Sequence, residues 1–307
     1  MTRTVSAYPD GQRGVALITA LVVVAIAAGI AAAMIWETGL DTRRTETLTQ
    51  GDQAMEYALG AESWAEQILA RNAKQNAQVT SLNQDWAQQM PPLPVEGGQI
   101  LGKIEDLQGR FNINNVSTPT GRTQFQNLLT ALGQDPALVA SVANWLTMGP
   151  AGSAIGAGDD QYTRLQPPYL SGQRAMASIS ELQLVAGFTP AVYAQVSPYL
   201  CALPIQGSTP TPININTASG PVIQSLNDHI SPDQASQVIG ERGNAGLSSP
   251  PAALQPYKIP PASYSYNSNY FLVTVVAQIG TTHVTLYSLL QNNGGQFSVI
   301  RRTFGTL

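Results

Sequence analysis

Residues 12–37 read QRGVALITALVVVAIAAGIAAAMIWE, and within this stretch 21 consecutive residues, Val15 to Ile35, carry no charge. A helix rises ~1.5 Å per residue, so a helix of this length spans the roughly 30 Å hydrocarbon layer of a membrane. Trp36 follows where the membrane interface would lie, and a short basic leader that ends at Gly14 precedes the run. The sequence therefore predicts one membrane-spanning helix near the N-terminus.

Two kinds of processing fit this segment. A secretory signal peptide would be cut at small residues such as Ala31-Ala32-Ala33, but its apolar region usually has only roughly 7–15 residues. A type IV prepilin would instead be cut in front of the apolar run and would keep the whole helix. Because the run is long for a signal peptide, we favour cleavage between Gly14 and Val15.

Composition agrees with a folded body outside the membrane and with few charged partners. Only 11% of the residues are charged, and the formal net charge is −4. Removal of residues 1–14, which carry Arg3, Asp10 and Arg13 and thus a net charge of +1, would leave −5. This balance does not suggest a polyanionic partner, because binding of phosphates requires clustered Lys or Arg. The single cysteine excludes an intramolecular disulfide.

Apolar periodicity continues beyond the membrane span. Leu48, Tyr57, Trp64 and Leu69 belong to a series at three- and four-residue steps, which predicts one helix to about residue 74. Polar residues follow and predict a loop. Segments rich in β-branched and aromatic residues predict strands at 98–104, 111–113, 270–279, 284–290 and 297–303, of which the last three would form an antiparallel sheet with turns at 280–282 and 293–295.

Capping residues mark the starts of several short helices between these strands. Asp135-Pro136, Thr189-Pro190 and Ser231-Pro232 each place an N-capping side chain before a proline at the first helical position. Residues 178–181 and 231–234 also have the spacing of a capping box. The region between the strands is therefore predicted to contain four or more short helices.

Two helix pairs resemble helical hairpins, 181–186 with 189–200 and 221–227 with 231–242. Such hairpins can bind DNA phosphates through backbone amides and basic side chains, so a membrane-anchored DNA receptor is a second functional hypothesis. However, the turn at 187–190 contains no cation, and the turn at 227–230 contains Asp228. We therefore expect no nucleic-acid partner.

Candidate catalytic residues are few. His229 and His283 are the only histidines, and no zinc, nucleophile-elbow or phosphate-loop motif is present. Cys201 is predicted to be a small buried apolar residue rather than a nucleophile. The Asn-Ile-Asn motifs at 112–114 and 214–216 are predicted to bond nearby backbone and to be structural. The sequence does not indicate an enzyme.

Seven short segments, spread over some 260 residues, share their order with one protein family. They are QRGVAL (12–17), DLQGRFNINN (106–115), GAGDDQY (156–162), PPY (167–169), SEL (180–182), ININTA (213–218) and SNYFLV (268–273). In these motifs the chain resembles the GspK family of large minor pseudopilins in type II secretion systems. Any one motif alone is weak, but their shared order is specific.

The resemblance implies an α+β fold. A pilin-like long N-terminal helix would pack on a small antiparallel sheet, with a large inserted all-α domain of helix-hairpin-helix or SAM-like type. The residue patterns give the same order of elements. We predict a leader at 1–14, a membrane-spanning part at 15–36, an outer half of the helix at 37–75, a first pilin-like β segment at 76–117, an inserted helical domain at 118–262 and a C-terminal antiparallel β segment at 263–307.

Thr19 stands at position five of the expected mature chain, where most pilins carry glutamate. A buried carboxylate is costly unless it is paired, and in pilins it is thought to pair with the α-amino group of the subunit ahead. A subunit with nothing ahead gains no such partner, so Thr19 fits a position at the tip of a fibre. The alternative is an ordinary membrane-helix threonine whose hydroxyl bonds to a backbone carbonyl.

Asp159 and Asp160 are adjacent carboxylates in a glycine-rich loop, and carboxylate and carbonyl oxygens are the ligands of Ca²⁺. GspK proteins bind calcium in the helical domain, so the resemblance makes calcium the candidate cofactor. Thr147 departs from the family pattern, which usually has aspartate after the pair that corresponds to Trp145-Leu146. One acidic ligand would be missing, and we expect calcium to bind weakly or not at all.

These expectations describe an interaction protein. By resemblance, it would join GspI-like and GspJ-like minor pseudopilins, and a GspH-like or major pseudopilin, at the tip of the type II secretion pseudopilus. A prepilin peptidase would cut after Gly14 and methylate Val15. The chain would cross the bacterial inner membrane once and hold its C-terminal body in the periplasm, where the helical domain would face the secretin or secreted cargo. Another type IV pilus minor pilin stays open as an alternative.

Overall fold

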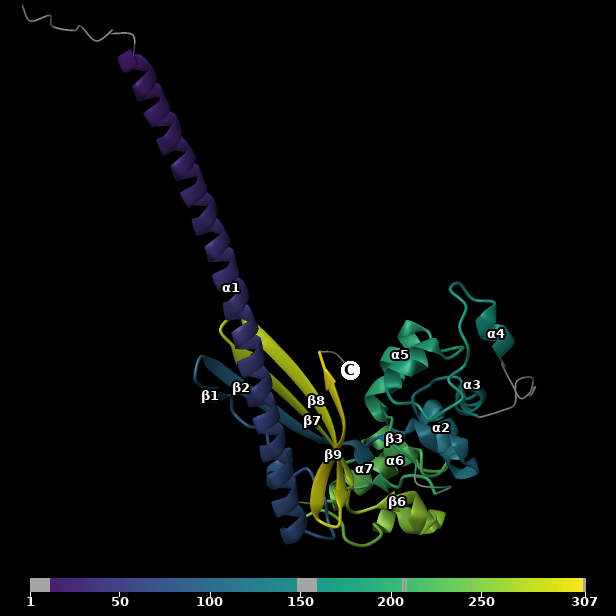
Figure 1. Cartoon of the computed structure of the whole chain (residues 1–307). Coiled ribbons are helices and arrows are strands. Elements are labelled where there is room, and N and C mark those ends of the chain that lie inside the picture. Colours follow the sequence, from purple (N-terminus) through teal and green to yellow (C-terminus); the bar gives the residue numbers. More distant parts are fainter. Residues whose placement is uncertain (1–11, 148–158, 206, 208, 244, 306–307) are drawn as a thin grey trace, which may run out of the picture.

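The computed structural model describes residues 12–147, 159–205, 207, 209–243 and 245–305. Figure 1 shows a long helix whose N-terminal half stands free of the rest of the chain and whose C-terminal half lies on one face of an antiparallel sheet. We call this helix and sheet the stem. The helices between the second and third strands of the sheet form a lobe on its other face. The predicted α+β fold is confirmed.

Helix α1 runs from Gln12 to Gln75, in agreement with the predicted end near residue 74. Four small or aliphatic side chains, Ala54, Ala58, Ala65 and Leu69, are at most 3% exposed on the face that contacts the sheet. Their spacing of four, seven and four residues places them on one side of a helix. Because alanine has no bulk beyond Cβ, the helix axis lies close to the sheet.

Five antiparallel strands form the sheet in the order β1-β2-β7-β8-β9. The β2 strand pairs with β7 although the whole lobe separates them along the chain, so the lobe is an insertion whose two ends emerge side by side. The first residue of β2 is glycine because a Cβ there would lie 1.8 Å from the carbonyl oxygen of Gln278. The strands are β1 (Leu93–Val95), β2 (Gly98–Asp106), β7 (Tyr270–Ile279), β8 (Thr282–Asn293) and β9 (Gln296–Phe304).

The lobe consists of short helices and two pairs of very short parallel strands. Its α-helices are α2 (Pro119–Ala131), α3 (Leu138–Leu146), α4 (Asp159–Thr163), α5 (Pro190–Val196), α6 (Gly220–Gln224) and α7 (Pro232–Glu241). The strand pairs are β3 (Phe111–Asn112) with β4 (Leu200–Cys201), and β5 (Ile213–Asn214) with β6 (Tyr264–Ser265). The 3₁₀ helices of the described chain are η1 (Asp85–Ala87), η2 (Leu107–Gly109), η3 (Ile113–Ser117), η4 (Ile179–Leu184), η5 (Ser197–Tyr199), η6 (Ala252–Tyr257) and η7 (Pro261–Ser263).

The stem and the lobe have separate hydrophobic cores. In the stem, the Trp86 and Phe271 rings meet edge to face with centroids 5.3 Å apart. In the lobe, Phe111 stacks on Phe125 at 5.6 Å. A thin third cluster lies between the sheet and the lobe, and we call it the interlobe layer. Its buried residues are Leu107, Cys201, Leu203, Tyr270, Leu272 and Leu289.

The helix starts were predicted with one error. Thr189 caps α5 and Ser231 caps α7, each followed by proline, and both capping boxes form, although the one at Ser178 opens the 3₁₀ helix η4. The prediction for Asp135-Pro136 is wrong, because α3 begins only at Leu138. The Asp135 carboxylate accepts from the amide of Ala137 at 2.8 Å, and i→i+3 bonds follow. This local turn forms in place of the first helical turn, so α3 begins at Leu138 instead of Pro136.

Candidate functional site

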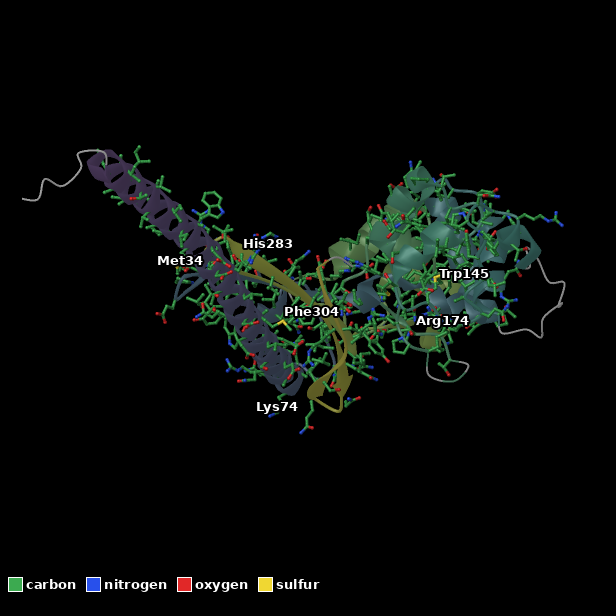
Figure 2. The ribbon with its side chains drawn as sticks, turned by 45° about the horizontal axis from the view of Figure 1, so that its top comes forward. Met34, Lys74, Trp145, Arg174, His283 and Phe304 are labelled. Carbon is green, nitrogen blue, oxygen red and sulfur yellow. The ribbon has the colours of Figure 1, made fainter. Side chains whose placement is uncertain are left out.

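The N-terminal half of α1 is an exposed apolar rod. Its large apolar side chains between Val15 and Ile35 are 50–74% exposed. Within the part of the chain that the structure describes, α1 is the one helix long and apolar enough to cross a membrane. Figure 2 shows Met34 on this free half and Lys74 near the other end of the helix, beside the sheet. An apolar surface of this size marks contact with a membrane or with other proteins.

The predicted processing site lies at the beginning of this rod. The backbone of both Gly14 and Val15 is part of α1. The hydroxyl of Thr19 donates to the carbonyl oxygens of Val15 at 3.1 Å and Ala16 at 3.0 Å. Thr19 therefore satisfies its own polar group within the helix and needs no partner from another subunit. Cleavage, methylation and the tip assignment remain predictions.

The predicted calcium ligands lie at the start of α4, but the side chains of Asp159 and Asp160 fall outside what the structure describes. Thr147 follows the end of α3, and its hydroxyl donates to the carbonyl of Ala143 at 2.6 Å. Among the described residues, no three His, Cys, Asp or Glu side chains gather closely enough to hold a metal ion. Because the side chains of Asp159 and Asp160 lie outside the described residues, this result does not bear on them, and calcium binding stays a prediction.

Cys201 is buried, as predicted from the sequence. Its thiol donates to the carbonyl of Leu107, with the sulfur 3.1 Å from the oxygen, and burial raises its pKa well above the usual value. A thiol in this setting is a poor nucleophile. His229 is exposed beside Asp228, and His283 lies on β8. Among the described residues, neither histidine is a hydrogen-bond partner of Cys201.

Both Asn-Ile-Asn motifs are structural, as predicted. The side chain of Asn114 donates to the carbonyls of Met176 and Leu203 at 2.9 Å and accepts from the amide of Met176. Asn216 bonds in the same way to the backbone of Leu247 and Tyr266. These buried amides replace regular secondary structure between segments far apart in the chain.

A buried carboxylate, which the sequence did not reveal, lies where the stem joins the lobe. Asp106 ends β2 and is 8% exposed. One of its oxygens accepts from the amide of Gln108 at 2.8 Å. The other oxygen accepts from Asn214 Nδ2 at 2.9 Å, Ser268 Oγ at 2.6 Å and Thr217 Oγ1 at 2.5 Å. We call these groups the junction network, because they connect β2, the second half of the lobe and the chain entering β7.

Burial raises the pKa of Asp106, and the four hydrogen bonds oppose that shift. Each oxygen of the carboxylate thus has at least one hydrogen-bond donor, as burial of a polar group requires. Asp106 belongs to a motif quoted for the family resemblance, but its partners lie more than 100 residues away in sequence, apart from Gln108. The network is therefore structural in character, since it connects β2 with distant segments of the chain.

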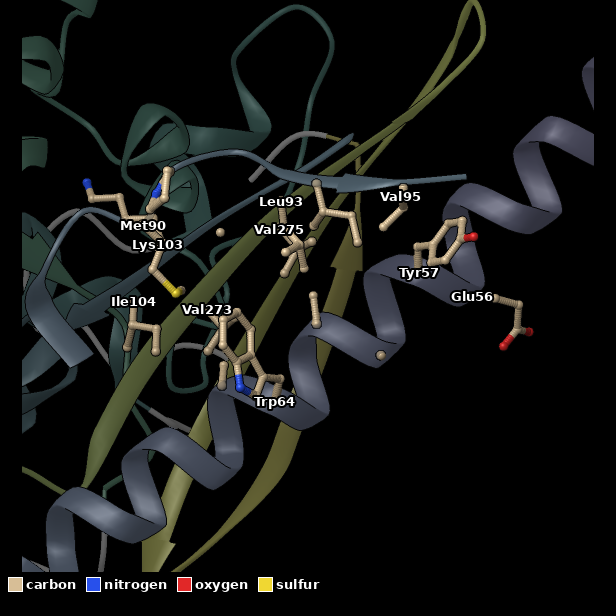
Figure 3. Close-up of a pocket in the computed structure, with 16 residues that line it drawn as sticks. Glu56, Tyr57, Trp64, Met90, Leu93, Val95, Lys103, Ile104, Val273 and Val275 are labelled. Atoms are coloured by element: carbon tan, nitrogen blue, oxygen red, sulfur yellow. The ribbon is translucent and has the colours of Figure 1, made fainter. Parts of the chain in front are cut away.

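An apolar groove lies between the outer half of α1 and the edge of the sheet formed by β1 and β2. Figure 3 shows Tyr57 and Trp64 on the helix, and Leu93 and Val95 on the strand across the groove. The groove encloses about 280 Å³, and Val273 and Val275 of β7 also line it. Glu56 and Lys103 are its two charged lining residues.

Glycine forms part of this groove on the helix side. A Cβ at Gly60 would meet no atom within 4 Å, so the fold itself leaves room for a side chain there. A helical glycine costs about 1 kcal/mol relative to alanine. The groove and the open position at Gly60 make this side of α1 the candidate assembly surface of the body.

Comparison with known proteins points to one family. Models described as "Type II secretion system (T2SS), protein K" match residues 109–205 and 213–264. The type II secretion system protein K of Pectobacterium carotovorum is 33% identical, covering 96% of this chain and 97% of that protein. The corresponding protein of Pseudomonas aeruginosa is also 33% identical, with 96% and 93% covered.

A solved structure agrees with the sequence comparison. A chain of the crystallised GspK–GspI–GspJ complex from the enterotoxigenic Escherichia coli type 2 secretion system superimposes with a TM-score of 0.74. The match has 25% sequence identity and covers 86% of this chain and 100% of the other. Fold and sequence thus agree over both the stem and the lobe.

Proposed function

Because this chain belongs to the type II secretion system protein K family, it is a minor pseudopilin of that system, and we propose that it occupies the tip of the pseudopilus. There it would form a complex with GspI-like and GspJ-like minor pseudopilins, followed by a GspH-like or major pseudopilin. The complex would initiate or limit pseudopilus assembly for protein export across the outer membrane. The crystallised GspK–GspI–GspJ complex of the Escherichia coli relative supports the GspI-like and GspJ-like partners.

One observation carries the proposal, namely the apolar half of α1, which is not buried against any other part of the chain that the structure describes. Roughly 25 cal/mol per Å² of apolar surface is gained on removal from water, so a helix with this exposure is stable only in a membrane or against other apolar helices. A pseudopilin uses both environments in turn, the membrane before assembly and its neighbours afterwards.

The same rod supports the processing and the location. Prepilin peptidase would cut after Gly14, methylate Val15 and leave the apolar half of α1 at the new N-terminus. The chain would then cross the inner membrane once, with its C-terminal body in the periplasm. Removal of the whole apolar run by a signal peptidase would leave the groove-forming half of α1 without an anchor.

Thr19 is compatible with a place at the tip, although its bonds within the helix are also those of an ordinary membrane-helix threonine. A glutamate at this position would need the α-amino group of a subunit ahead, whereas the hydroxyl of Thr19 is already bonded to Val15 and Ala16. A subunit with nothing ahead therefore leaves no buried carboxylate unpaired. The lobe would project from the tip toward the secretin or the secreted cargo, and any calcium ion at Asp159 and Asp160 would be bound weakly.

The groove beside α1 would receive the outer half of a partner's long helix. Partners anchored in the same membrane present their helices at a similar height, and the open position at Gly60 lets a second helix approach closely. The small groove volume fits a few bulky aliphatic side chains rather than a whole helix. The partner's helix would thus lie across the rim and insert its side chains.

Co-purification of the full chain with its GspI-like and GspJ-like partners tests this function. Gly60→Leu would fill the groove and is expected to lower partner recovery at least tenfold while leaving the fold intact. Ser63→Leu is the matched control, because Ser63 is exposed on the same part of α1 and does not line the groove. Equal recovery of partners with both variants would contradict the proposed surface.

A further inference from the structure

Two consecutive arginines at the end of β9 contact opposite sides of the sheet. In the pairing of β8 with β9, Leu290 is opposite Val299 and Leu289 is opposite Arg301, so Ile300 is an extra residue. Such a β-bulge shifts the alternation of side chains by one position. The residues after the bulge therefore point to the opposite faces from those that the regular alternation would give.

The contacts of the surrounding residues identify the two faces. Phe297 and Val299 pack against the stem core, on the α1 side. Regular alternation would place Arg301 on that same side. Because of the bulge, Arg301 instead lies opposite Leu289, a residue of the interlobe layer, and Arg302 lies opposite Ser288.

On the stem side, Arg302 binds a buried carboxylate of α1. Arg302 Nη2 lies 2.7 Å from Glu62 Oε1, and Nε lies 3.1 and 2.9 Å from the two carboxylate oxygens. The Ser288 hydroxyl also donates to Glu62. The Glu62 side chain is only 3% exposed. This bidentate pair fixes both the distance and the angle between α1 and β9.

On the lobe side, Arg301 holds the loop that begins η4. Its guanidinium donates to the carbonyl of Ala177. The same loop is made rigid by its capping box, in which Glu181 accepts from the amides of Ala177 at 2.7 Å and Ser178 at 3.3 Å. Arg301 therefore binds a part of the lobe that is held in place by its own hydrogen bonds.

The lobe is thus attached to the stem by directional contacts at separate places. The junction network binds Asn214 and Thr217 in the second half of the lobe. Arg301 binds Ala177 in the first half. The interlobe layer between them is apolar and imposes little directionality of its own. Contacts with both halves of the lobe oppose its rotation on the sheet.

We propose that Arg301 and Arg302 are positioning residues which, turned to opposite faces by the bulge at Ile300, fix the angle between the lobe and the long helix. This inference goes beyond the proposed function, because it concerns the direction in which the lobe projects and not the partners that are bound. A lobe held at one angle transmits a force directed along the axis of α1, whereas a lobe on a flexible hinge would rotate relative to α1 under the same force.

Spin-label distance measurements on the full chain in detergent test the proposal. Label pairs are placed at exposed positions, Ser63 with Gln183 for stem to lobe and Gln67 with Gln296 for helix to β9. The native Cys201 is buried and can stay in place. Arg301→Ala is expected to widen the stem-to-lobe distance distribution at least twofold and to leave the helix-to-β9 distribution unchanged.

Three further variants make the test specific. Arg302→Ala is expected to widen the helix-to-β9 distribution. If Arg302→Ala does not fold, Arg302→Lys is used in its place, because lysine keeps the positive charge but cannot form the bidentate contact with Glu62. Arg301→Lys retains a donor for Ala177 and should restore the narrow stem-to-lobe distribution. Arg174→Ala is the matched control, because Arg174 also contacts Glu181, at 3.5 Å, but belongs to the lobe and not to β9.

Two results would overturn the proposal. One is a stem-to-lobe distribution in Arg301→Ala that equals that of the unchanged protein. The other is an equal widening of both distributions by Arg301→Ala, because that would indicate general loosening rather than positioning.

Discussion

Replacement of Asp106 by asparagine is expected to destabilise the fold by about 1–3 kcal/mol, the cost of one buried donor left without an acceptor. The carboxylate accepts four hydrogen bonds through two oxygens. If the amide oxygen of the asparagine takes the position that faces Asn214, the amide NH₂ meets the backbone N–H of Gln108. If the group is flipped, NH₂ meets the NH₂ of Asn214. In either orientation one donor faces another.

The size of this loss is expected to depend on pH. In the folded state burial raises the pKa of Asp106 above its ordinary value of 3.8, which applies to the unfolded chain. Between pH 3.8 and the raised pKa, Asp106 is ionised in the unfolded state but still protonated in the folded state. This ionisation lowers the free energy of the unfolded state relative to the folded state. The unchanged protein therefore loses stability between 3.8 and the raised pKa, and the asparagine variant does not. The difference between the two proteins is largest below pH 3.8 and shrinks toward neutral pH.

Urea unfolding of the full chain in detergent, at an acid and a neutral pH, measures this difference. Trp86 in the stem core and Trp145 in the lobe core report on the two bodies by fluorescence. Asp135→Asn is the control, because Asp135 is exposed and asparagine can also accept from Ala137; its effect should stay within about 0.5 kcal/mol. An Asp106→Asn midpoint equal to that of the unchanged protein at both pH values would refute the role of the junction network. An equal loss at both pH values would refute the pKa argument.

Three further outcomes are expected. Phe125→Ala removes a fully buried ring that stacks on Phe111, so it should cost about 3–5 kcal/mol in urea unfolding, and a loss below about 1 kcal/mol would contradict this packing. The Cys201 thiol, with a pKa raised by burial, should react with a maleimide only after denaturation, and rapid labelling of the native chain would show that the interlobe layer is open. A calcium concentration equal to the dissociation constant should stabilise the chain by about 0.4 kcal/mol. In a thermal melt, we expect this small gain in stability only at millimolar calcium. A large gain at micromolar calcium that is lost in Asp159→Asn would show a strong site despite Thr147.

The elements themselves were largely predictable because their signals are local. The β7 strand has the bounds predicted from its β-branched and aromatic residues, and Ser231 caps α7 as its spacing with Gln234 indicated. Local chemistry also explains the one wrong helix start, where Asp135 closes a turn with Ala137. Such features depend on neighbours within a few residues, which a sequence displays directly.

The contacts between the stem and the lobe were not predictable, because each joins residues that are distant in the chain. Asp106 meets Asn214 across 108 positions, and Arg302 meets Glu62 across 240. The Ile300 bulge is also invisible in the sequence, since 297–303 reads as a regular strand. The two arginines therefore gave no sign that they would face opposite sides. The groove at Gly60 likewise exists only once β1 and β2 lie beside α1.

Intact and N-terminal mass spectrometry of the chain extracted from membranes tests the central claim most directly. The account predicts a mature protein that begins at Val15, carries one added methyl group and retains the whole apolar half of α1. A mature chain that begins near Met34 and is recovered without detergent would contradict it, because the surface proposed to enter the membrane and the pseudopilus would then be absent.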